Sequence, residues 1–199
     1  MNTKSCFLTL MLLVSMLVTS CDETKEVGKY DNWRERNEAF IDSLQNVYDT
    51  KTDHGGLDTI HLVSNPYKYL FFKKKAPVAP IGQEPVIKDV SPLFTDDVLV
   101  FYKGSNIIGS IDAKGNFVGE IFDGNFMEAD PSFEFSKQSQ FKVSQLIPGW
   151  TEMLQRMKVG ERLELYIPWE YGYGASGNSS ILGYSTLIFD MQLIDIVEK

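Results

Sequence analysis

The chain has 199 residues, 43% of them hydrophobic, which suffices for one well-packed core with extensions and does not suggest two full domains. Its 19 Lys and Arg against 27 Asp and Glu give a formal net charge of -8. Nucleic-acid binding needs a basic surface that neutralises phosphates, so this charge argues against a nucleic-acid partner. The one cationic run, residues 73–75, is short and indicates a solvated strand end.

The N-terminus carries a targeting signal. An apolar run from Phe7 to Val18 follows Lys4, and it is too short to span a bilayer comfortably but fits a signal-peptide core. The run ends in LVTSC, where an aliphatic residue stands three positions before Cys21 and a small residue directly before it. This pattern resembles the lipobox of bacterial lipoproteins. The resemblance implies a lipoprotein signal peptide over residues 1–20 and lipidation of Cys21; the alternative is an ordinary signal peptide with a chance cysteine.

A lipid on Cys21 would anchor the mature chain to a membrane of the bacterial cell envelope, facing the periplasm or the cell surface. Residues 21–28 are charged and lack an apolar pattern, so we expect a tether there. Cys6 would leave with the signal peptide, and the mature chain would then have no second cysteine for a disulfide. Its stability must therefore come from packing.

Residues 29–91 are predicted to form an N-terminal extension with an amphipathic helix and a strand. One helical stripe collects the apolar residues Trp33, Phe40, Ile41, Leu44, Val47 and Tyr48. Facing away from it are the polar residues Asn32, Glu35, Glu38 and Asp42. The stripe can pack on the rest of its own chain or form a homodimer through residues 29–50. A single short stripe lacks the repeated heptads of a coiled coil, which favours packing within the chain.

Strand signals follow the predicted helix. Residues 67–72 are rich in strand-favouring aromatics, and residues 76–85 hold three prolines, which indicates a connector. Alternating apolar residues predict a strand over 98–102, which Gly104 is expected to end. We therefore expect the extension to add one strand before a domain over residues 92–199.

The rest of that domain also shows strand patterns. Gly115-Asn116 predicts a hairpin between residues 107–111 and 117–121. Two further strand segments cover residues 141–147 and 186–193. Repeated strands with turn signals between them predict a sheet that is largely antiparallel.

One short helix interrupts these strands. Pro148-Gly149 predicts a turn, and apolar residues at 150, 153, 154 and 157 have the spacing of a helix with one buried face. Gly160 is expected to end it, before an alternating strand over residues 162–167. An antiparallel sheet with one short helix across it belongs to the α+β class.

Catalysis that depends on metals or nucleophiles has little support in the sequence. His54 and His61 are the two histidines, and neither has a second ligand at metal spacing. Covalent catalysis lacks an activating base beside a plausible nucleophile. Residues 174–177, GASG, lack the full patterns of a nucleophile elbow or a phosphate loop. We expect no metal and no cofactor.

Six segments follow one another in this part of the chain: VFYKG at 100–104, IFD at 121–123, LIPGW at 146–150, MKVGE at 157–161, IPWEYGYG at 167–174 and LIFD at 187–190. With these segments in this order, residues 92–199 resemble an FKBP-type peptidyl-prolyl cis-trans isomerase domain, closest to the Mip-like bacterial branch. The resemblance implies an FKBP-like antiparallel sheet wrapped around one short helix. It also implies that the protein catalyses cis-trans isomerisation of X-Pro bonds.

The resemblance further implies a proline pocket. Its floor would be Trp150, and its walls would be Tyr102, Phe122, Leu146, Ile147 and Phe189. Its polar members would be Asp123 and Tyr173, with the Tyr173 hydroxyl and the Ile147 N–H donating hydrogen bonds to the substrate. Ile181 and Leu182 would lie on a flap loop over the pocket.

Two departures from the family pattern leave two functions open. Ser139 stands where the family often has a further aromatic, for which Phe133 or Phe135 is a substitute, and the flap segment 181–184 has no proline. The first function is a membrane-anchored isomerase that helps exported, proline-containing polypeptides to fold. The alternative is a catalytically weak FKBP-like binding or chaperone module in a surface or periplasmic assembly.

The predicted pocket suits the chemistry of isomerisation. Rotation about a peptide bond meets a barrier of about 18–20 kcal/mol because the C–N bond has partial double-bond character. Lowering that barrier needs no nucleophile; it needs a site that binds the twisted amide better than either planar form. Aromatic side chains can exclude water from the amide, and a few fixed donors can hold its twisted geometry.

Overall fold

The computed structural model describes residues 28–53, 56–63, 68–111 and 117–197. The expected signal peptide, Cys21 and all but the last residue of the expected tether lie outside these ranges. From Asn32 onward the chain packs as one unit. In the parts of the chain just given, no helix has the length and apolar character needed to cross a membrane.

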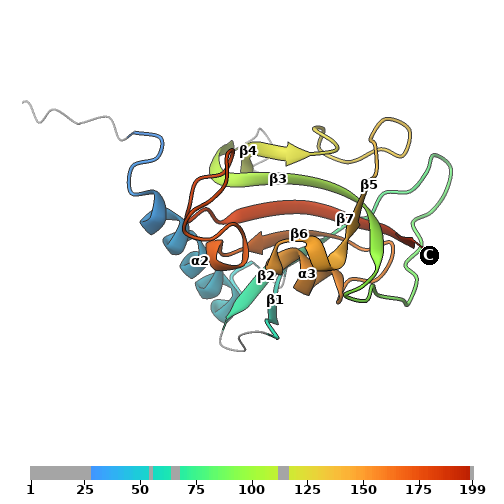
Figure 1. Ribbon diagram of the computed structural model, residues 1–199, viewed down its shortest axis with the longest axis horizontal. Coiled ribbons are helices and arrows are strands. Elements are labelled where there is room, and N and C mark those ends of the chain that lie inside the picture. The colour runs from blue at the N-terminus through green and yellow to red at the C-terminus, as the bar shows by residue number, and fades with distance from the viewer. Residues whose placement is uncertain (1–27, 54–55, 64–67, 112–116, 198–199) are drawn as a thin grey trace, which may run out of the picture. The chain divides into compact units, whose positions relative to one another are not determined.

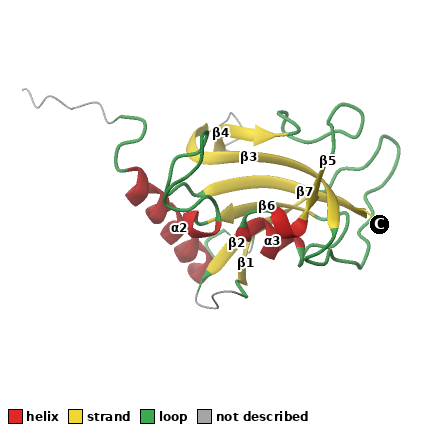
Figure 2. Ribbon diagram, viewed as in Figure 1, coloured by secondary structure: helices red, strands yellow, loops and turns green. Residues whose placement is uncertain are grey.

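A seven-stranded antiparallel sheet dominates the fold (Figures 1 and 2). Its strands are β1 (Leu57–His61), β2 (Tyr69–Lys75), β3 (Asp97–Ile111), β4 (Phe117–Gly124), β5 (Ser139–Lys142), β6 (Arg162–Ile167) and β7 (Leu187–Val197). They follow the order β1-β2-β6-β7-β3-β4, and β5 also pairs with β3. With α2 (Trp33–Thr50) and α3 (Pro148–Leu154), the sheet confirms the predicted α+β class.

Two helices use opposite faces of this sheet. The paired residues Phe71, Tyr166 and Ile188 lie side by side on neighbouring strands and pack in one apolar cluster with α2. Their neighbours Phe72, Leu165 and Phe189 form the next row and pack in the main core with α3. Successive residues of a strand point to opposite faces, so both faces of the central strands are buried.

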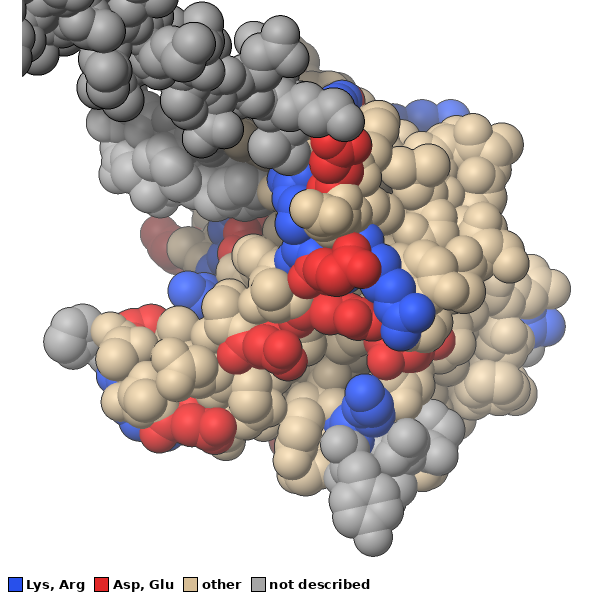
Figure 3. Space-filling view, turned by 90° about the vertical axis from the view of Figure 1, so that its left-hand side faces the viewer, with Lys and Arg blue, Asp and Glu red and all other residues tan. Residues whose placement is uncertain are grey.

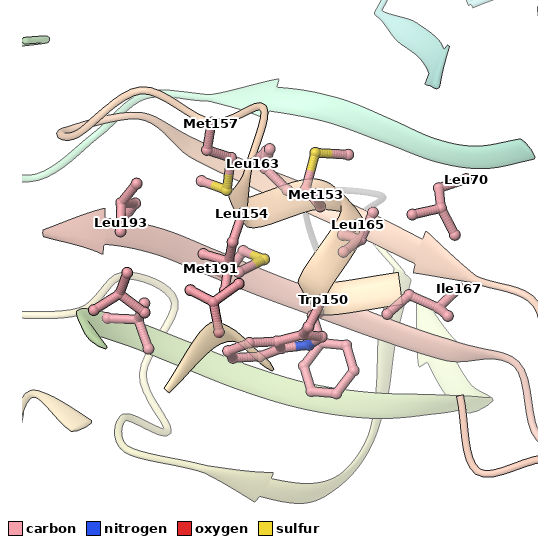
Figure 4. Close-up of a cluster of buried hydrophobic side chains, with 14 of the residues drawn as sticks. Leu70, Trp150, Met153, Leu154, Met157, Leu163, Leu165, Ile167, Met191 and Leu193 are labelled. Atoms are coloured by element: carbon pink, nitrogen blue, oxygen red, sulfur yellow. The ribbon is translucent and has the colours of Figure 1, made fainter. Parts of the chain in front are cut away.

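Helix α3 supplies the centre of the main core. Its buried residues Trp150, Met153 and Leu154 lie against the apolar side chains of the sheet (Figure 4). The predicted turn at Pro148-Gly149 is wrong, because Pro148 occupies the first helical position and the helix starts there. Proline suits that position, since its fixed φ fits a helix and the first N–H has no partner within the helix. The buried face is confirmed at 150, 153 and 154, but the helix ends at Leu154. Met157 is therefore buried beyond the helix, and the prediction that Gly160 ends it is wrong.

Gly104 continues a strand that the sequence predicted it would end. Strand β3 runs on to Ile111, with irregular pairing to β4 beside Ser105. A Cβ on Gly104 would lie 2.6 Å from the Phe189 ring and 2.7 Å from the Phe122 ring. Glycine therefore lets two aromatic rings approach the backbone, and it does so within the strand.

The strands near the hairpin and the extension agree with most of the predictions. The hairpin is confirmed, since Ile111 pairs with Phe117 and Gly109 with Gly119. The predicted strand at 67–72 is observed as β2, and it pairs with β6. The sequence analysis missed β1, a short strand that completes the edge of the sheet.

Helix α2 packs on its own chain. Phe40, Ile41, Leu44, Val47 and Tyr48 lie against the α2 side of the sheet, as the first of the two alternatives predicted. A buried polar residue, Asn37, also lies on this face and was not anticipated. The side of the molecule that carries α2 shows basic and acidic side chains interspersed (Figure 3). This mixture gives that side no broad basic surface.

Candidate functional site

A cluster of aromatic rings lies at the N-terminal end of α3. Trp150 is 3% exposed, and its ring meets those of Tyr102, Phe141 and Phe189 edge to face, with centroids 5.4, 5.8 and 5.1 Å away. Phe122 extends the cluster, because its ring lies 5.6 Å from that of Phe189. Rings at these angles and distances attract one another beyond the effect of their burial. The cluster joins β3, β4, β5, α3 and β7 around one indole.

The indole nitrogen of Trp150 is an unpaired buried donor among the described residues. Its Nε1 is buried and makes no hydrogen bond with any described part of the chain. A buried N–H without a partner costs free energy, so such a group is uncommon in a folded protein. The indole ring is thus held by the packing of its neighbours.

The carboxylate of Asp123 borders the cluster and is bonded to one of its members, Tyr102. The Tyr102 hydroxyl donates a hydrogen bond of 2.9 Å to Oδ2 of Asp123, and Oδ1 of Asp123 accepts the N–H of Gly124 over 2.8 Å. Burial and this hydrogen bond raise the pKa of Tyr102 well above its ordinary value. The site therefore holds an exposed carboxylate whose orientation is fixed by a tyrosine and by the backbone.

Tyr173 lies near the same carboxylate. Its pKa is raised first by partial burial and then by the negative charge of Asp123. The residue is nevertheless 39% exposed, so its hydroxyl remains protonated and accessible in the neutral pH range. Tyr173 can therefore donate a hydrogen bond to a molecule that enters the site.

The segment before α3 offers a backbone donor. Leu146 and Ile147 are partly buried against the main core, and Ile147 is the N-cap residue of α3. The Ile147 carbonyl accepts the N–H groups of Trp150 and Thr151 over 3.0 and 3.1 Å. Its own N–H makes no hydrogen bond within the described ranges and is available to a ligand.

The predicted flap residues differ from one another in burial. Ile181 is 7% exposed and belongs to the main core, whereas Leu182 is 47% exposed. Asn178 shapes this loop, since its Oδ1 accepts the N–H groups of Ser180 and Ile181, both over 2.8 Å. The structure brings Ile181 to the core beside α3 and leaves the Leu182 side chain in solvent.

The position of Ser139 is explained by its partners. Its hydroxyl accepts a hydrogen bond of 3.1 Å from the Asn125 side chain, which also bonds to the backbone of β3. Neither proposed substitute joins the cluster: Phe133 packs on Phe101, and Phe135 is 91% exposed. Phe141 supplies the further ring beside Trp150, a residue that the sequence analysis did not include in the site. Strand alternation after Ser139 could have indicated it.

A cavity of about 500 Å³ lies away from the aromatic cluster, beside the C-terminal end of α3. Its lining includes Ile60, Phe72 and Met157 and is mainly apolar. The cationic groups on its rim are paired with carboxylates, as in Lys74 with Glu161. Its donors are cations that are already paired with carboxylates, whereas the aromatic cluster offers donors to a ligand, so the cluster is the better candidate for chemistry.

No cofactor or metal has an evident place in the described site. Among the residues that the structure describes, no group of three or more His, Cys, Asp or Glu side chains could hold a metal ion. The groups available to a ligand are one carboxylate, one phenol, one backbone N–H and several rings. Such a set can enclose an apolar ring and bind a carbonyl oxygen.

Residues 95–194, half of the chain, match the family described as FKBP-type peptidyl-prolyl cis-trans isomerase. The chain belongs to this family of isomerases. A probable FKBP-type peptidyl-prolyl cis-trans isomerase from Haemophilus influenzae is 29% identical over 201 residues, covering 94% of this chain and 82% of that one. The macrophage infectivity potentiator of Trypanosoma cruzi is 39% identical over 82 residues, covering 41% of each chain. Kinship with Mip is thus confirmed.

The Escherichia coli protein FkpA is similar in sequence and in structure. Its sequence is 35% identical over 109 residues, covering 55% of this chain but 34% of FkpA. The FkpA crystal structure aligns with a TM-score of 0.51 and 22% identity, covering 98% of this chain and 73% of that one. The structural likeness confirms the expected FKBP-like fold.

Proposed function

We propose that this FKBP-type isomerase catalyses rotation about X-Pro bonds of exported polypeptides and uses the aromatic cluster as its proline pocket. The observation that carries the proposal is the arrangement of Tyr102, Phe141 and Phe189 edge to face around Trp150. Such a box accepts an apolar ring and excludes water around it. Proline is the residue whose ring and tertiary amide fit this environment.

In the proposed mechanism, the proline ring of the substrate rests on the Trp150 indole. Removal of water from the amide weakens the polar planar form, because that form depends most on solvation. The Tyr173 hydroxyl and the Ile147 N–H then hold backbone carbonyl groups of the substrate on either side of the bond. Donors fixed in advance can favour the twisted amide without reorganising during the reaction.

Asp123 has a different role in this proposal. Its carboxylate is held by Tyr102 and by the N–H of Gly124, so it presents a fixed negative charge at the mouth of the pocket. A fixed dipole or charge can stabilise the altered charge distribution of the twisted amide. Neither Asp123 nor Tyr173 has to transfer a proton.

A proline-isomerisation assay tests the function. We expect the soluble fragment from Glu23 to accelerate isomerisation of a proline tetrapeptide, and Tyr173→Phe and Asp123→Ala to lower kcat/KM by about tenfold each. The control variants Tyr30→Phe and Asp42→Ala make the same chemical changes at exposed positions outside the pocket. A wild-type rate no higher than the uncatalysed rate, with peptide binding retained, would instead identify a binding or chaperone module.

We also propose that the protein is a lipoprotein of the cell envelope, anchored through Cys21. The support is the LVTSC segment after an apolar run of signal-peptide length. Metabolic labelling with a fatty-acid analogue, followed by membrane fractionation, tests the anchor. The wild-type chain should carry label and sediment with membranes, and Cys21→Ser should do neither. Label on the Cys21→Ser variant would refute the assignment.

A homodimer through residues 29–50 stays a prediction. The apolar stripe of α2 that would carry it is covered by the sheet of the same chain. We therefore expect that this stripe is not available to a second chain. Sedimentation equilibrium of the fragment from Glu23 should give the mass of one chain, and a concentration-dependent doubling of mass would support the dimer.

A further inference from the structure

The first two turns of α2 contact the loop over residues 178–186. This loop holds Ile181 and Leu182, the two residues that the family resemblance places over the proline pocket. We propose that α2 holds this loop in its substrate-binding shape, with Asn37 as a positioning residue and with Trp33 and Arg34 as supports. The proposal rests on the proposed isomerase function, because it takes Ile181 and Leu182 to border the proline pocket.

Asn37 joins the helix to the end of the loop. It is fully buried, and its Oδ1 accepts the N–H of Thr186 over 2.7 Å while its Nδ2 donates to the Trp33 carbonyl over 2.7 Å. The Thr186 hydroxyl donates in turn to the Asn37 carbonyl over 3.3 Å. A buried amide is unfavourable unless it is paired, and a fully paired one selects a single arrangement. Asn37 thus sets where the loop enters β7.

Trp33 extends this connection into the loop. Its Nε1 donates a hydrogen bond of 3.2 Å to the Ser185 hydroxyl, which donates over 2.6 Å to the Leu182 carbonyl. Ser185 is 4% exposed, so both bonds are shielded from water. A continuous line of hydrogen bonds therefore runs from the indole on α2 to the backbone of Leu182.

Tyr184 gives the loop a strained conformation that needs support. Its φ of 61° lies in the left-handed region, which is unfavourable for a bulky side chain. The Tyr184 ring packs on the Trp169 ring, with their centroids 4.9 Å apart. The guanidinium of Arg34, on α2, lies 4.7 Å from the centroid of the Tyr184 ring. The Tyr184 N–H donates to the Gly174 carbonyl over 3.0 Å, next to Tyr173. These contacts offset the strain and tie the loop to the Tyr173 segment.

The polar contacts of α2 serve the loop and are separate from its apolar anchorage. The apolar residues that dock the helix on the sheet begin at Phe40, in its later turns. The hydrogen bonds and the cation on the tyrosine ring come from residues 33–37, in the first turns. A helix that only covered the sheet would not need a buried amide directed at Thr186.

Two variants of the full chain in detergent, each with a matched control, test the inference. Asn37→Ala removes the paired amide, and Asn46→Ala makes the same change on the exposed side of the helix. Arg34→Ala removes the cation beside Tyr184, and Arg34→Lys keeps a cation there. The measurements are kcat and KM for a proline tetrapeptide, amide hydrogen exchange over residues 178–186, and the thermal midpoint.

We expect Asn37→Ala and Arg34→Ala to raise KM by about fivefold with kcat within about twofold of wild type. Exchange over residues 178–186 should rise in both, with α3 still protected, and Arg34→Lys and Asn46→Ala should resemble wild type. Unchanged loop exchange and KM in folded variants would overturn the inference. Arg34 is exposed, so its substitution should not prevent folding. The comparison of Arg34→Ala with Arg34→Lys therefore tests the inference even if Asn37→Ala does not fold. If wild type is inactive, the isomerase proposal fails, whereas exchange alone still decides whether α2 holds the loop.

Discussion

The Tyr102 hydroxyl donates a 2.9 Å hydrogen bond to Oδ2 of Asp123, so two residues from neighbouring strands act as one unit at the mouth of the aromatic cluster. Tyr102 at the same time packs its ring edge to face on Trp150. One side chain thus contributes both an apolar wall and the orientation of the carboxylate.

Tyr102→Phe keeps the ring against Trp150 and removes the hydroxyl that orients Asp123. We expect kcat/KM to fall by about fivefold to tenfold, because Asp123 loses one of its two fixed donors. The unfolding free energy should change by about 1 kcal/mol or less. Steady-state kinetics and urea denaturation measure the two quantities. A double variant with Asp123→Ala should be no slower than Asp123→Ala alone if the hydroxyl acts through that carboxylate.

The raised pKa values of Tyr102 and Tyr173 predict how the protein responds to alkaline pH. Burial is the first cause in both, and it favours the protonated phenol in the folded state. Their contribution to stability is therefore fully present below the unfolded pKa of about 10, and it is lost as pH rises beyond that value toward the folded pKa. The unfolding free energy should fall above about pH 10.

Absorbance titration of tyrosinate checks this pH dependence. Tyr102 and Tyr173 should ionise later than exposed tyrosines, and Tyr102→Phe should remove part of the late-titrating signal. Between about pH 7 and 9.5 neither phenol ionises, so kcat/KM should show no step due to them. A fall in kcat/KM with a midpoint near pH 9 that disappears in Tyr173→Phe would contradict the assignment.

Trp150 can be tested through its unpaired Nε1. Trp150→Phe loses no protein hydrogen bond, so any loss in unfolding free energy comes from the smaller side-chain volume alone. Trp150→Ala should lower the unfolding free energy by about 3–5 kcal/mol. We expect Trp150→Phe to destabilise by roughly half as much or less, and both variants to bind a proline peptide more weakly. Urea denaturation and peptide titration measure these effects. Equal destabilisation by the two variants would show that the indole N–H has a partner in solution.

Gly104→Ala should displace two rings of the aromatic cluster. The added methyl group would meet the rings of Phe189 and Phe122 at 2.6 and 2.7 Å, so both rings must shift. We expect a loss of about 1–3 kcal/mol in unfolding free energy and a raised KM, because two walls of the pocket move together. Unfolding curves and kinetics together check this, and wild-type values for both would mean that the rings have room to relax.

The sequence predicted the features that depend on local patterns. The apolar spacing of α3 and of α2 identified two amphipathic helices, and six segments in family order identified the fold. The same segments contain most rings of the aromatic cluster. Each of these patterns is a property of neighbouring residues. Pairing of Tyr102 with Asp123 was not predicted, since no local pattern shows which polar groups on two strands will meet.

The errors arise where distant parts of the chain decide the local structure. Gly104 was expected to end a strand, but rings from β4 and β7 require a residue without a side chain there. Asparagine is usually found on the surface, and the burial of Asn37 depends in part on its hydrogen bond with Thr186, 149 positions away. Phe141 joins the aromatic cluster because β5 pairs with β3. Contacts between distant residues cannot be predicted from the pattern of neighbouring residues in the sequence.

The pairing of β2 with β6 has a consequence for the solubility of the isolated isomerase region. If the chain were cut before residue 92, β6 would become the edge of the sheet, with Leu165 and Ile167 on an uncovered ladder of backbone donors and acceptors. Exposed apolar edges recruit strands from other molecules and promote aggregation. We expect a fragment from Pro92 to aggregate where the fragment from Glu23 stays dispersed. The N-terminal segment, through β2, then protects the β6 edge of the isomerase region from pairing with strands of other molecules.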